Sequence, residues 1–385
     1  MINKIIILGN HIQALGIARL AAKLGLSVHL FNNYSLCVTR FSNTCNQFIL
    51  FHDQDDLLDK LIETGKSDKK ALLIPTNDYL VYFISKNYDL LSKRFYLSTP
   101  DPNITQFCYH KKYTYKKALE LNISIPESYF PESTEDINTI KNKLPYPVII
   151  KPAIMHSFFT LTGKKVLLCR NQGELIENYI TMSSVIPKDE IIIQEMVPGG
   201  AKNLYSYGSF AADGIIYGGF AAHRSRQKPM DFGISSCYVR TVNSPALKEL
   251  AEKFLYGINY FGFSEVEFMY DERTGEFKML EINPRFWKWH SIANRLGINM
   301  IDMMIRYYQH QKIEKINNKK DNIAWIERIT DSYVVLREIF AKRMSVKEYI
   351  HSLGVEKEYA VWSGNDPLPA LMYLLLTPYL IFKRL

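Results

Sequence analysis

The stretch FSEVEFMYD (residues 263–271), the link ERTG (272–275) and the run EFKMLEINPRFW (276–287) decide the fold of this chain. Apolar and polar residues alternate along both outer segments, which is the pattern of β-strands that each bury one face. Asp271 and Gly275 supply turn residues between the two segments. The three pieces together predict a β-hairpin.

Polar groups gather on one face of this predicted hairpin. Alternation puts Glu281 and Asn283 on the same face, and Glu267 lies across from Glu281 if the hairpin pairs about its centre. Two carboxylates and an amide oxygen so close together need a cation, and such hard oxygen ligands suit Mg²⁺ bound to substrate phosphates. Arg285 follows at the strand exit, in position to bind a phosphoryl group in transfer. A surface hairpin with solvated acids is the alternative, which the clustering of these residue types after an apolar strand disfavours.

The first hundred residues predict a small parallel α/β domain. The apolar run 4–8 is typical of a buried strand, and apolar residues recur at near-helical spacing over 12–24 before a second strand at 28–31. A similar unit follows, with a strand at 71–74 and a helix at 79–92. Parallel strands joined by helices are the expected result.

Two polar turns follow strands of this domain. Gly9-Asn10-His11 lacks the pattern G-x-G-x-x-G, so we predict a tight turn there rather than a nucleotide fingerprint. Asp78 follows the strand at 71–74, where α/β folds place ligand contacts. A helix N-cap explains Asp78 equally well.

The middle of the chain changes character. A helical stretch over 104–130 is followed by runs typical of strands, with only two helical patterns among them. The predicted strands are 148–152, 164–169, 190–196, 204–211, 214–222, 263–270 and 277–283, and the predicted helices are 172–183 and 245–257. An α+β pattern after an α/β domain predicts a boundary near residue 100. We expect an α/β domain at 1–103, an α+β domain at 104–310 with a small lobe at about 125–197 and a large lobe at about 198–310, and an extension at 311–385.

The end of the chain is almost wholly apolar from 368 to 382 and contains Pro369 and Pro378. Fifteen residues with two prolines are fewer than the roughly 20 that cross a membrane comfortably. Two interpretations stay open: a terminal helix packed on the core, and an interfacial anchor with Tyr373 and Tyr379 at headgroup depth and Lys383-Arg384 on phosphates.

Bulk composition excludes few classes of function or binding partner. The 385 residues carry 47 Lys and Arg against 39 Asp and Glu, and the net charge of +8 suits an anionic substrate, a membrane surface or nucleic acid. No compact basic motif with interleaved aromatics is present, which disfavours nucleic acid. The five cysteines are scattered without a C-x-x-C pair, and the first residues lack a signal-peptide pattern. We therefore expect a cytoplasmic protein. The alternative is a protein that also contacts the inner membrane face peripherally through 368–382.

The order of Glu267, Glu281, Asn283 and Arg285 resembles the metal-binding hairpin of the ATP-grasp superfamily. That resemblance implies an N-terminal Rossmann-like domain followed by two α+β lobes that enclose ATP. It also implies that Glu267, Glu281 and Asn283 hold Mg²⁺, or alternatively Mn²⁺. Arg285 then steadies the transferred phosphate and an acyl phosphate.

Other expected parts of that superfamily appear in order along the chain. Lys111 is similar to the first ATP-contacting lysine, and Lys151 in VIIKP (148–152) is similar to the second, which meets the phosphates and assists transfer. The stretch IQEMVPG (193–199) resembles the interlobe hinge, so Gln194, Glu195 and Val197 are expected at adenine and ribose. The usual phosphate loop is glycine-rich, whereas residues 153–165 contain one glycine, so Lys164 or Lys165 is expected to supply charge instead.

This loop and the basic stretch HRSRQKPMDFG (223–233) are similar to carboxylate–amine ligases of the D-aspartate ligase type, found in cell-wall and surface-polymer pathways. Arg224 and Arg226, two residues apart, are predicted to bind one substrate carboxylate or phosphate, with His156 also on the substrate side. An exposed basic strand end is the alternative for the two arginines.

The resemblance implies an ATP- and Mg²⁺-dependent ligase that forms an amide through an acyl phosphate. The expected acid is an amino acid, and the expected amine is carried by a cell-wall or surface-polysaccharide precursor, lipid- or nucleotide-linked. Two alternatives remain: phosphoryl transfer of the carboxyphosphate type, and a nucleotide-binding scaffold at the membrane without catalysis. A monomer and a homodimer are both compatible with the sequence.

Overall fold

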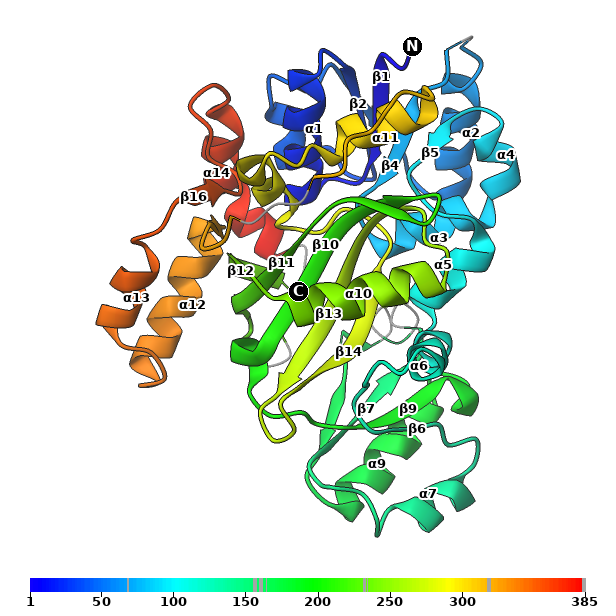
Figure 1. Cartoon of the computed structure of the whole chain (residues 1–385), viewed down its shortest axis with the longest axis vertical. Helices are drawn as coiled ribbons and strands as arrows, with labels where there is room; N and C mark the ends of the chain where they lie inside the picture. The colour runs from blue at the N-terminus through cyan, green and yellow to red at the C-terminus, as the bar shows by residue number, and fades with distance from the viewer. Residues whose placement is uncertain are drawn as a thin grey trace.

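The computed structural model describes residues 1–67, 69–154, 158, 162–163, 165–230, 233, 235–316 and 320–382. Three sheets form the body of the molecule, and Figure 1 shows them one above another, from the N-terminal sheet at the top to a four-stranded lobe at the bottom. The mixed α/β and α+β fold class predicted from the sequence is confirmed.

The N-terminal sheet has five parallel strands in the order β3-β2-β1-β4-β5. The predicted strands and the first helix are confirmed, and the side chains of Ile5 to Leu8 are fully buried. The predicted helix at 79–92 is two helices, since α3 ends at Lys86 and α4 begins at Tyr88, with Asn87 between them. Its elements are β1 (Lys4–Leu8), α1 (Ile12–Lys23), β2 (Ser27–Asn32), β3 (Gln47–Leu50), α2 (Gln54–Thr64), β4 (Leu72–Pro75), α3 (Asp78–Lys86), α4 (Tyr88–Ser92) and β5 (Tyr96–Leu97).

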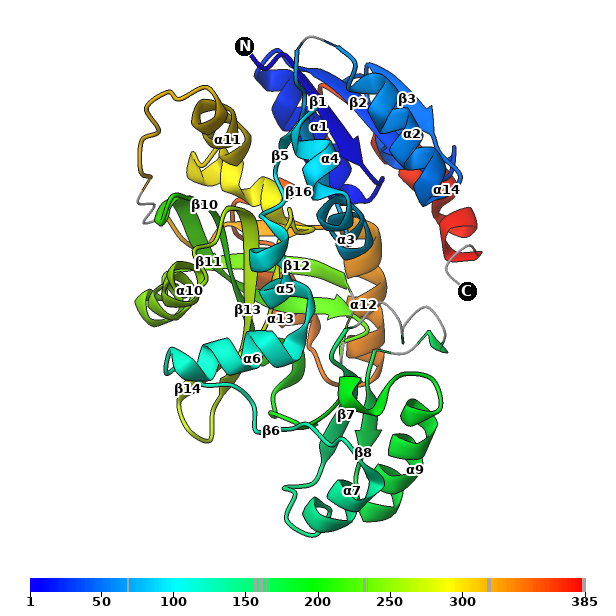
Figure 2. The ribbon, with the colours of Figure 1, turned by 90° about the vertical axis from the view of Figure 1, so that its right-hand side faces the viewer.

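A small lobe contains four antiparallel strands in the order β6-β9-β7-β8. Two helices lie together on one side of this sheet (Figure 2). The predicted helix at 172–183 is confirmed as α9. The elements are β6 (Ser128–Tyr129), α7 (Thr134–Ile140), β7 (Val148–Pro152), β8 (Leu167–Cys169), α9 (Gln172–Ser183) and β9 (Ile191–Glu195).

The largest sheet has seven strands in the order β14-β13-β10-β11-β12-β15-β16. Its first strands come from the middle of the chain, whereas β15 and β16 come from the residues after 311 and extend the same sheet. The predicted helix at 245–257 is confirmed as α10. The strands are β10 (Leu204–Ala212), β11 (Ile215–Lys228), β12 (Ser235–Val242), β13 (Gly262–Asp271), β14 (Glu276–Asn283), β15 (Ala324–Ile326) and β16 (Lys357–Tyr359), and the helices beside them are α5 (Pro102–Tyr109), α6 (Lys111–Glu120), α10 (Pro245–Gly257) and α11 (Met300–Tyr308).

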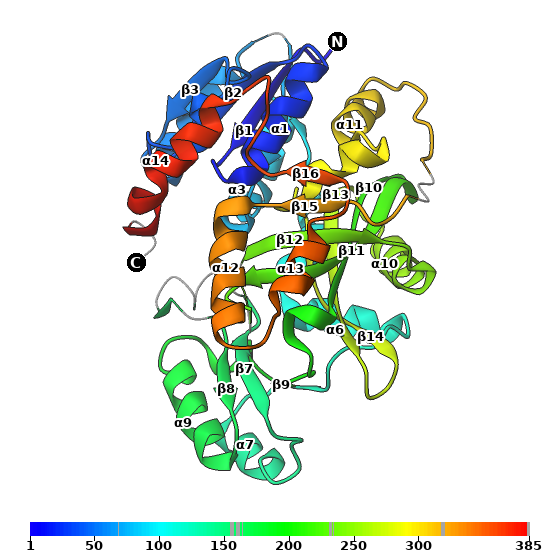
Figure 3. The same ribbon diagram turned by 90° about the vertical axis from the view of Figure 1, so that its left-hand side faces the viewer.

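The C-terminal segment returns to the N-terminal sheet. After α12 (Arg328–Phe340) and α13 (Val346–Ser352), the chain reaches α14 (Leu368–Phe382), which lies along the N-terminal domain in Figure 3. Asp366 fixes the start of α14, because its buried carboxylate accepts hydrogen bonds from Arg19 Nε at 2.9 Å, Ser42 Oγ at 2.7 Å and the backbone amide of Asn43 at 3.0 Å.

The inner face of α14 agrees with one of the two interpretations of the apolar tail, a terminal helix packed on the core. Ala370, Tyr373 and Leu376 face the protein, where the first two pack against the largest core cluster and Leu376 is buried. On the outer face, the side chains of three leucines are more than half exposed: Leu371, Leu374 and Leu375. Among the described residues, no helix has both the length and the apolarity that a membrane crossing requires.

Candidate active site

A cavity of about 1320 Å³ lies where the three sheets meet. The predicted site residues that line it are Lys111, Lys151, Lys165, Gln194, Glu195, Val197, Arg224, Glu267, Glu281, Asn283 and Arg285. Arg226 is absent from this lining, and His156 and Lys164 lie outside the described residues. Eleven side chains scattered from position 111 to position 285 thus reach one space.

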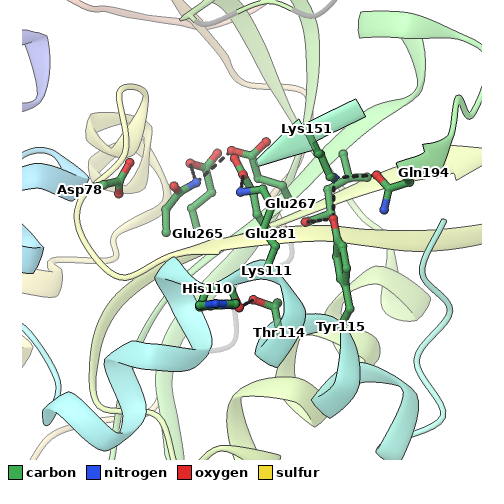
Figure 4. A network of polar contacts seen from close by, with 12 residues as sticks. Asp78, His110, Lys111, Thr114, Tyr115, Lys151, Gln194, Glu265, Glu267 and Glu281 are labelled. Carbon is green, nitrogen blue, oxygen red and sulfur yellow. Dashed lines mark hydrogen bonds and ion pairs between the residues drawn. The ribbon is translucent and has the colours of Figure 1, made fainter. Parts of the chain in front are cut away.

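The hairpin β13–β14 forms one wall of the cavity, and its predicted register is confirmed. Glu267 pairs with Glu281, and Glu265 pairs with Asn283 on the same face. Asn283 Nδ2 donates to Glu267 Oε1 at 2.9 Å and to Glu265 Oε2 at 3.2 Å. Figure 4 shows the three carboxylates side by side. Glu265 was not predicted, although its spacing of two from Glu267 places it on the same face.

Cations of the chain itself neutralise these carboxylates. Lys111 Nζ lies 2.8 Å from Glu281 Oε2 and lowers the pKa of Glu281 well below its ordinary value, against the opposing effect of burial. Arg224 contacts Glu267 directly, and its Nη1 lies 3.7 Å from Glu265 Oε1. Burial, followed by the repulsion of Glu267, raises the pKa of Glu265 to about 7. Buried carboxylates without compensating charge are costly, which explains these pairs.

The hairpin residues fit a divalent metal by their chemistry. Carboxylate oxygens of Glu267 and Glu281 and the amide oxygen of Asn283 are hard donors of the kind that Mg²⁺ prefers. Within the described part of the chain, no three His, Cys, Asp or Glu side chains are arranged around one point as metal ligands. Lys111 and Arg224 contact the two carboxylates instead, so a metal would bind by displacing them.

The residues predicted to contact the nucleotide line one part of the cavity. Lys151 Nζ donates to Tyr115 Oη at 2.7 Å and to Gln194 Oε1 at 2.6 Å, which holds this ammonium inside the cavity. Burial lowers the pKa of Lys165, which faces Glu281 and Glu267. Apolar side chains surround this part, as expected for a pocket that takes an aromatic base: they are Ile149, Leu168, Val197, Met269 and Leu280.

Glu195 lies at the predicted hinge, but its carboxylate already has partners. Arg273 Nη2 donates to it at 2.8 Å, Lys278 contacts its other oxygen, and the amide of Glu127 donates at 3.0 Å. Burial alone would raise the pKa of Glu195, and these hydrogen bonds outweigh that effect and lower it. Sequence reasoning missed Arg273 and Lys278, which fix the position of the hinge.

At the other end of the cavity, Arg285 connects the hairpin to the N-terminal domain. Its Nε and Nη2 donate to the two carboxylate oxygens of Asp78 at 2.7 and 2.9 Å, and Nη2 also donates to Asn283 Oδ1 at 3.1 Å. Asn77 caps helix α3, so Asp78, the first residue of that helix, is free of the capping role considered for it. A bidentate pair of this kind fixes the plane of the guanidinium.

The residues after Arg285 are anchored in the core. Trp287 and Trp289 are each 1% exposed, and Trp287 packs onto β10 at Gly208. A Cβ atom at Gly208 would lie 2.0 Å from the Trp287 ring, so only glycine permits this packing. Arg285 therefore projects from a rigid support.

The sequence suggested that Arg224 and Arg226 bind one substrate group. In the structure the two side chains reach different places. Arg224 reaches the cavity, and its Nε donates to Ser236 Oγ at 2.9 Å. Arg226 Nε and Nη2 donate to the two oxygens of Asp331 at 2.6 and 2.9 Å, and its guanidinium lies 3.8 Å from the ring centre of Tyr238. The strand register shifts on both sides of Arg226, and α12 supplies the acid that binds it.

We expect Arg226→Met to lower the free energy of unfolding by about 3–5 kcal/mol, because it leaves the buried Asp331 carboxylate without its partner. Turnover per folded molecule should change little, since the side chain lies away from the cavity. Urea denaturation followed by tryptophan fluorescence measures the first effect. Arg328→Met, at an exposed arginine of α12, is the matched control and should change stability by less than about 0.5 kcal/mol. A large loss of turnover with unchanged stability would instead restore Arg226 to the substrate site.

Comparisons with known proteins agree with this geometry. Residues 235–316, which include the hairpin, match the family model described as "Carbamoyl-phosphate synthase L chain, ATP binding domain". The chain is 25% identical to D-aspartate ligase of Enterococcus faecium over 77% of its own length and 74% of that protein. It is 27% identical to the carbamoyl phosphate synthase large chain of Methanobrevibacter smithii over 57% of its length, but spans only 21% of that protein.

Solved structures show the same fold. The biotin carboxylase domain of 2-oxoglutarate carboxylase from Hydrogenobacter thermophilus, in complex with MgADP, ADP and bicarbonate, matches with a TM-score of 0.67. The match covers 84% of this chain and 72% of that chain at 14% identity. At such low identity the likeness is one of fold.

Proposed function

We propose that this chain is an ATP-dependent ligase with the ATP-grasp fold. In this proposal it joins a carboxylic acid to an amine through an acyl phosphate. The observation that carries the proposal is the single cavity in which Lys111, Lys151, Glu281 and Arg285 meet. Groups that bind phosphates and a metal lie in its middle, and its cationic far end faces the N-terminal domain.

In the proposed reaction, ATP supplies the γ-phosphoryl group, and Mg²⁺ held beside it would neutralise part of its charge. Lys111 and Lys151 bind the phosphates from one side, and Arg285 orients the attacking carboxylate from the other. Phosphoryl transfer of this kind depends on positioning and charge stabilisation more than on covalent catalysis. The amine then displaces phosphate to give an amide, with ADP and phosphate as the other products. Mg²⁺ is proposed at Glu267, Glu281 and Asn283, and Mn²⁺ suits the same oxygen donors.

We propose an amino acid as the acid substrate. Arg224, Arg285 and Lys288 line the cavity, which suits a small molecule with one carboxylate or two. The similarity to a D-aspartate ligase supports this class. The amine is proposed to belong to a cell-wall or surface-polysaccharide precursor, because the cavity is large enough for an extended acceptor beside ATP.

A second candidate is phosphoryl transfer to bicarbonate. The match of residues 235–316 to the carbamoyl-phosphate synthase family favours it. Bicarbonate-dependent ADP release without hydroxamate would identify this chemistry.

The test is phosphate release from ATP and Mg²⁺ with pooled D- and L-amino acids, with and without hydroxylamine to trap an acyl phosphate. Phosphate and hydroxamate should both depend on one amino acid in the pool. Tight ATP binding with no turnover on any acid and none on bicarbonate would contradict the proposal.

We also propose that the outer face of α14 contacts the cytoplasmic membrane surface. Three leucines on this face, at positions 371, 374 and 375, are 53%, 60% and 61% exposed, and the sequence continues into Lys383-Arg384. A shallow apolar face beside basic residues is typical of interfacial helices. Since Tyr373 on the inner face lines the cavity, membrane contact would bring a lipid-linked amine close to the site.

The variant Leu371→Ser/Leu374→Ser/Leu375→Ser should lose sedimentation with phosphatidylglycerol vesicles and keep its thermal stability, because these side chains contact solvent in the folded protein. Leu336→Ser on α12, where the leucine is 56% exposed, is the matched control and should still sediment. Unchanged sedimentation of the triple variant would rule out this membrane contact.

A further inference from the structure

Arg224 occupies an unusual position among the carboxylates of the hairpin. It extends from β11 and is only 7% exposed, and its Nε is held by Ser236 Oγ at 2.9 Å. Its Nη1 contacts the Glu267 oxygen Oε2 and lies 3.7 Å from the Glu265 oxygen Oε1. One guanidinium thus serves two neighbouring carboxylates.

These contacts rest on charge rather than on well-formed hydrogen bonds. Nη1 of Arg224 and Oε1 of Glu265 are both buried and lack a hydrogen-bond partner within the described residues. Buried polar atoms are normally satisfied, so an arrangement that leaves two of them unsatisfied is open to exchange. Arg224 and a divalent metal ion compete for Glu267, because both are cations and each is stabilised by the same carboxylate charge.

We infer that Arg224 is a resident counter-ion of the metal site, which competes with the divalent cation for Glu267 and moves to Glu265 when the cation binds. This inference rests on the proposed function, because it takes Glu267 as a metal ligand. Nη1 already lies 3.7 Å from Glu265 Oε1, so the exchange needs only a small shift of the guanidinium. Glu265, which the reaction itself does not require, is then a positioning residue that accepts Arg224.

The exchange couples the binding of the metal–nucleotide to the binding of the acid substrate. While Arg224 pairs with Glu267, its charge is neutralised within the hairpin. Once it is displaced, part of its guanidinium faces the cavity and can bind an anionic group of the acid substrate. Metal–nucleotide binding and acid binding therefore favour each other through reciprocal coupling.

The test measures Mn²⁺ binding in the presence of ADP, with free Mn²⁺ followed by electron paramagnetic resonance. Arg224→Gln removes the competitor and should tighten Mn²⁺ binding by about 10-fold, within the usual range of coupling between sites. Lys228→Gln removes an equal charge at the edge of the cavity and should change the affinity by less than about 2-fold. Equal tightening in both variants would reduce the effect to general electrostatics and overturn the inference.

Glu265 is tested by a double-mutant cycle. Glu265→Gln should weaken Mn²⁺ binding by about 5-fold in the wild-type background, because Arg224 then has no second partner. In the Arg224→Gln background the same substitution should have almost no effect, since the competitor is gone. Equal weakening in both backgrounds would show that Glu265 simply attracts the metal, which would overturn the inference.

A structure of the wild-type protein with Mn²⁺ and ADP provides an answer that does not depend on the folding of variants. Nη1 of Arg224 should have left Glu267 and lie within hydrogen-bond distance of Glu265. A guanidinium still on Glu267 with Mn²⁺ bound would overturn the inference. Wild-type protein that binds Mn²⁺ no better than Glu281→Gln would contradict the proposed metal site itself, which is a different outcome.

Discussion

Glu281→Gln is expected to reduce acid-dependent phosphate release by on the order of 10³-fold, the usual range for losing one transition-state contact in a preorganised site. The substitution removes the charge of a proposed metal ligand and also leaves the ammonium of Lys111 without its carboxylate partner at 2.8 Å. Because Gln is nearly isosteric with Glu, the hairpin register should persist. The loss should therefore appear in kcat and in Mn²⁺ affinity, with the thermal unfolding midpoint nearly unchanged.

The measurement is a comparison of phosphate and hydroxamate formation by the variant and the wild type at saturating ATP. Glu272→Gln is the matched control, because Glu272 is an exposed acid in the turn of the same hairpin. It should retain full activity. A Glu281→Gln variant with more than about a tenth of wild-type turnover would exclude Glu281 from the metal site.

Arg285→Lys is expected to lower kcat by on the order of 10²-fold to 10³-fold, and ATP affinity should change little. Lysine keeps the charge but cannot make the bidentate contact by which Asp78 fixes the guanidinium. Asp78→Asn should have a smaller effect of about 10-fold, because Arg285 keeps its place on the anchored segment but loses its orientation.

Single-turnover phosphate release separates this step from product release. Arg295→Lys serves as the control, because this arginine also pairs with a carboxylate, Glu358 at 2.8 Å, but is half exposed and remote from the cavity. It should behave as wild type. Equal losses from Arg285→Lys and Arg295→Lys would indicate a general structural defect instead of a role in transfer.

The hairpin could be predicted from the sequence because its information is local. Alternation predicts the shared face of Glu281 and Asn283, and the turn at Gly275, whose φ is +73°, joins the two strands. A register shift between Glu267 and Phe268 then places Glu267 opposite Glu281. The same local reasoning predicted α9 and α10 at their observed bounds. Strands of two residues, such as β5 and β6, have no period to detect and were not predicted.

Long-range contacts could not be predicted from the sequence, because their partners are far apart along the chain. The partner of Arg285 is Asp78, 207 residues earlier, and the partner of Arg226 is Asp331, 105 residues later. Nothing in the spacing of either arginine distinguishes a substrate-binding guanidinium from one that pairs with another element. The two faces of α14 show the same limit, since an almost uniformly apolar helix carries no signal of which side packs against the protein.

The contacts of Asp366 can form only late in translation, after most of the chain has been synthesised. Its partners Arg19, Ser42 and Asn43 are synthesised well before it, and 347 residues separate Arg19 from Asp366. At about 5–20 residues per second, the N-terminal sheet emerges many seconds before α14 exists to cover its side. Throughout that interval the nascent chain exposes the apolar surface beside Val38 that α14 covers in the folded protein. A stop codon that removes the last twenty residues would leave this apolar surface exposed in the finished protein.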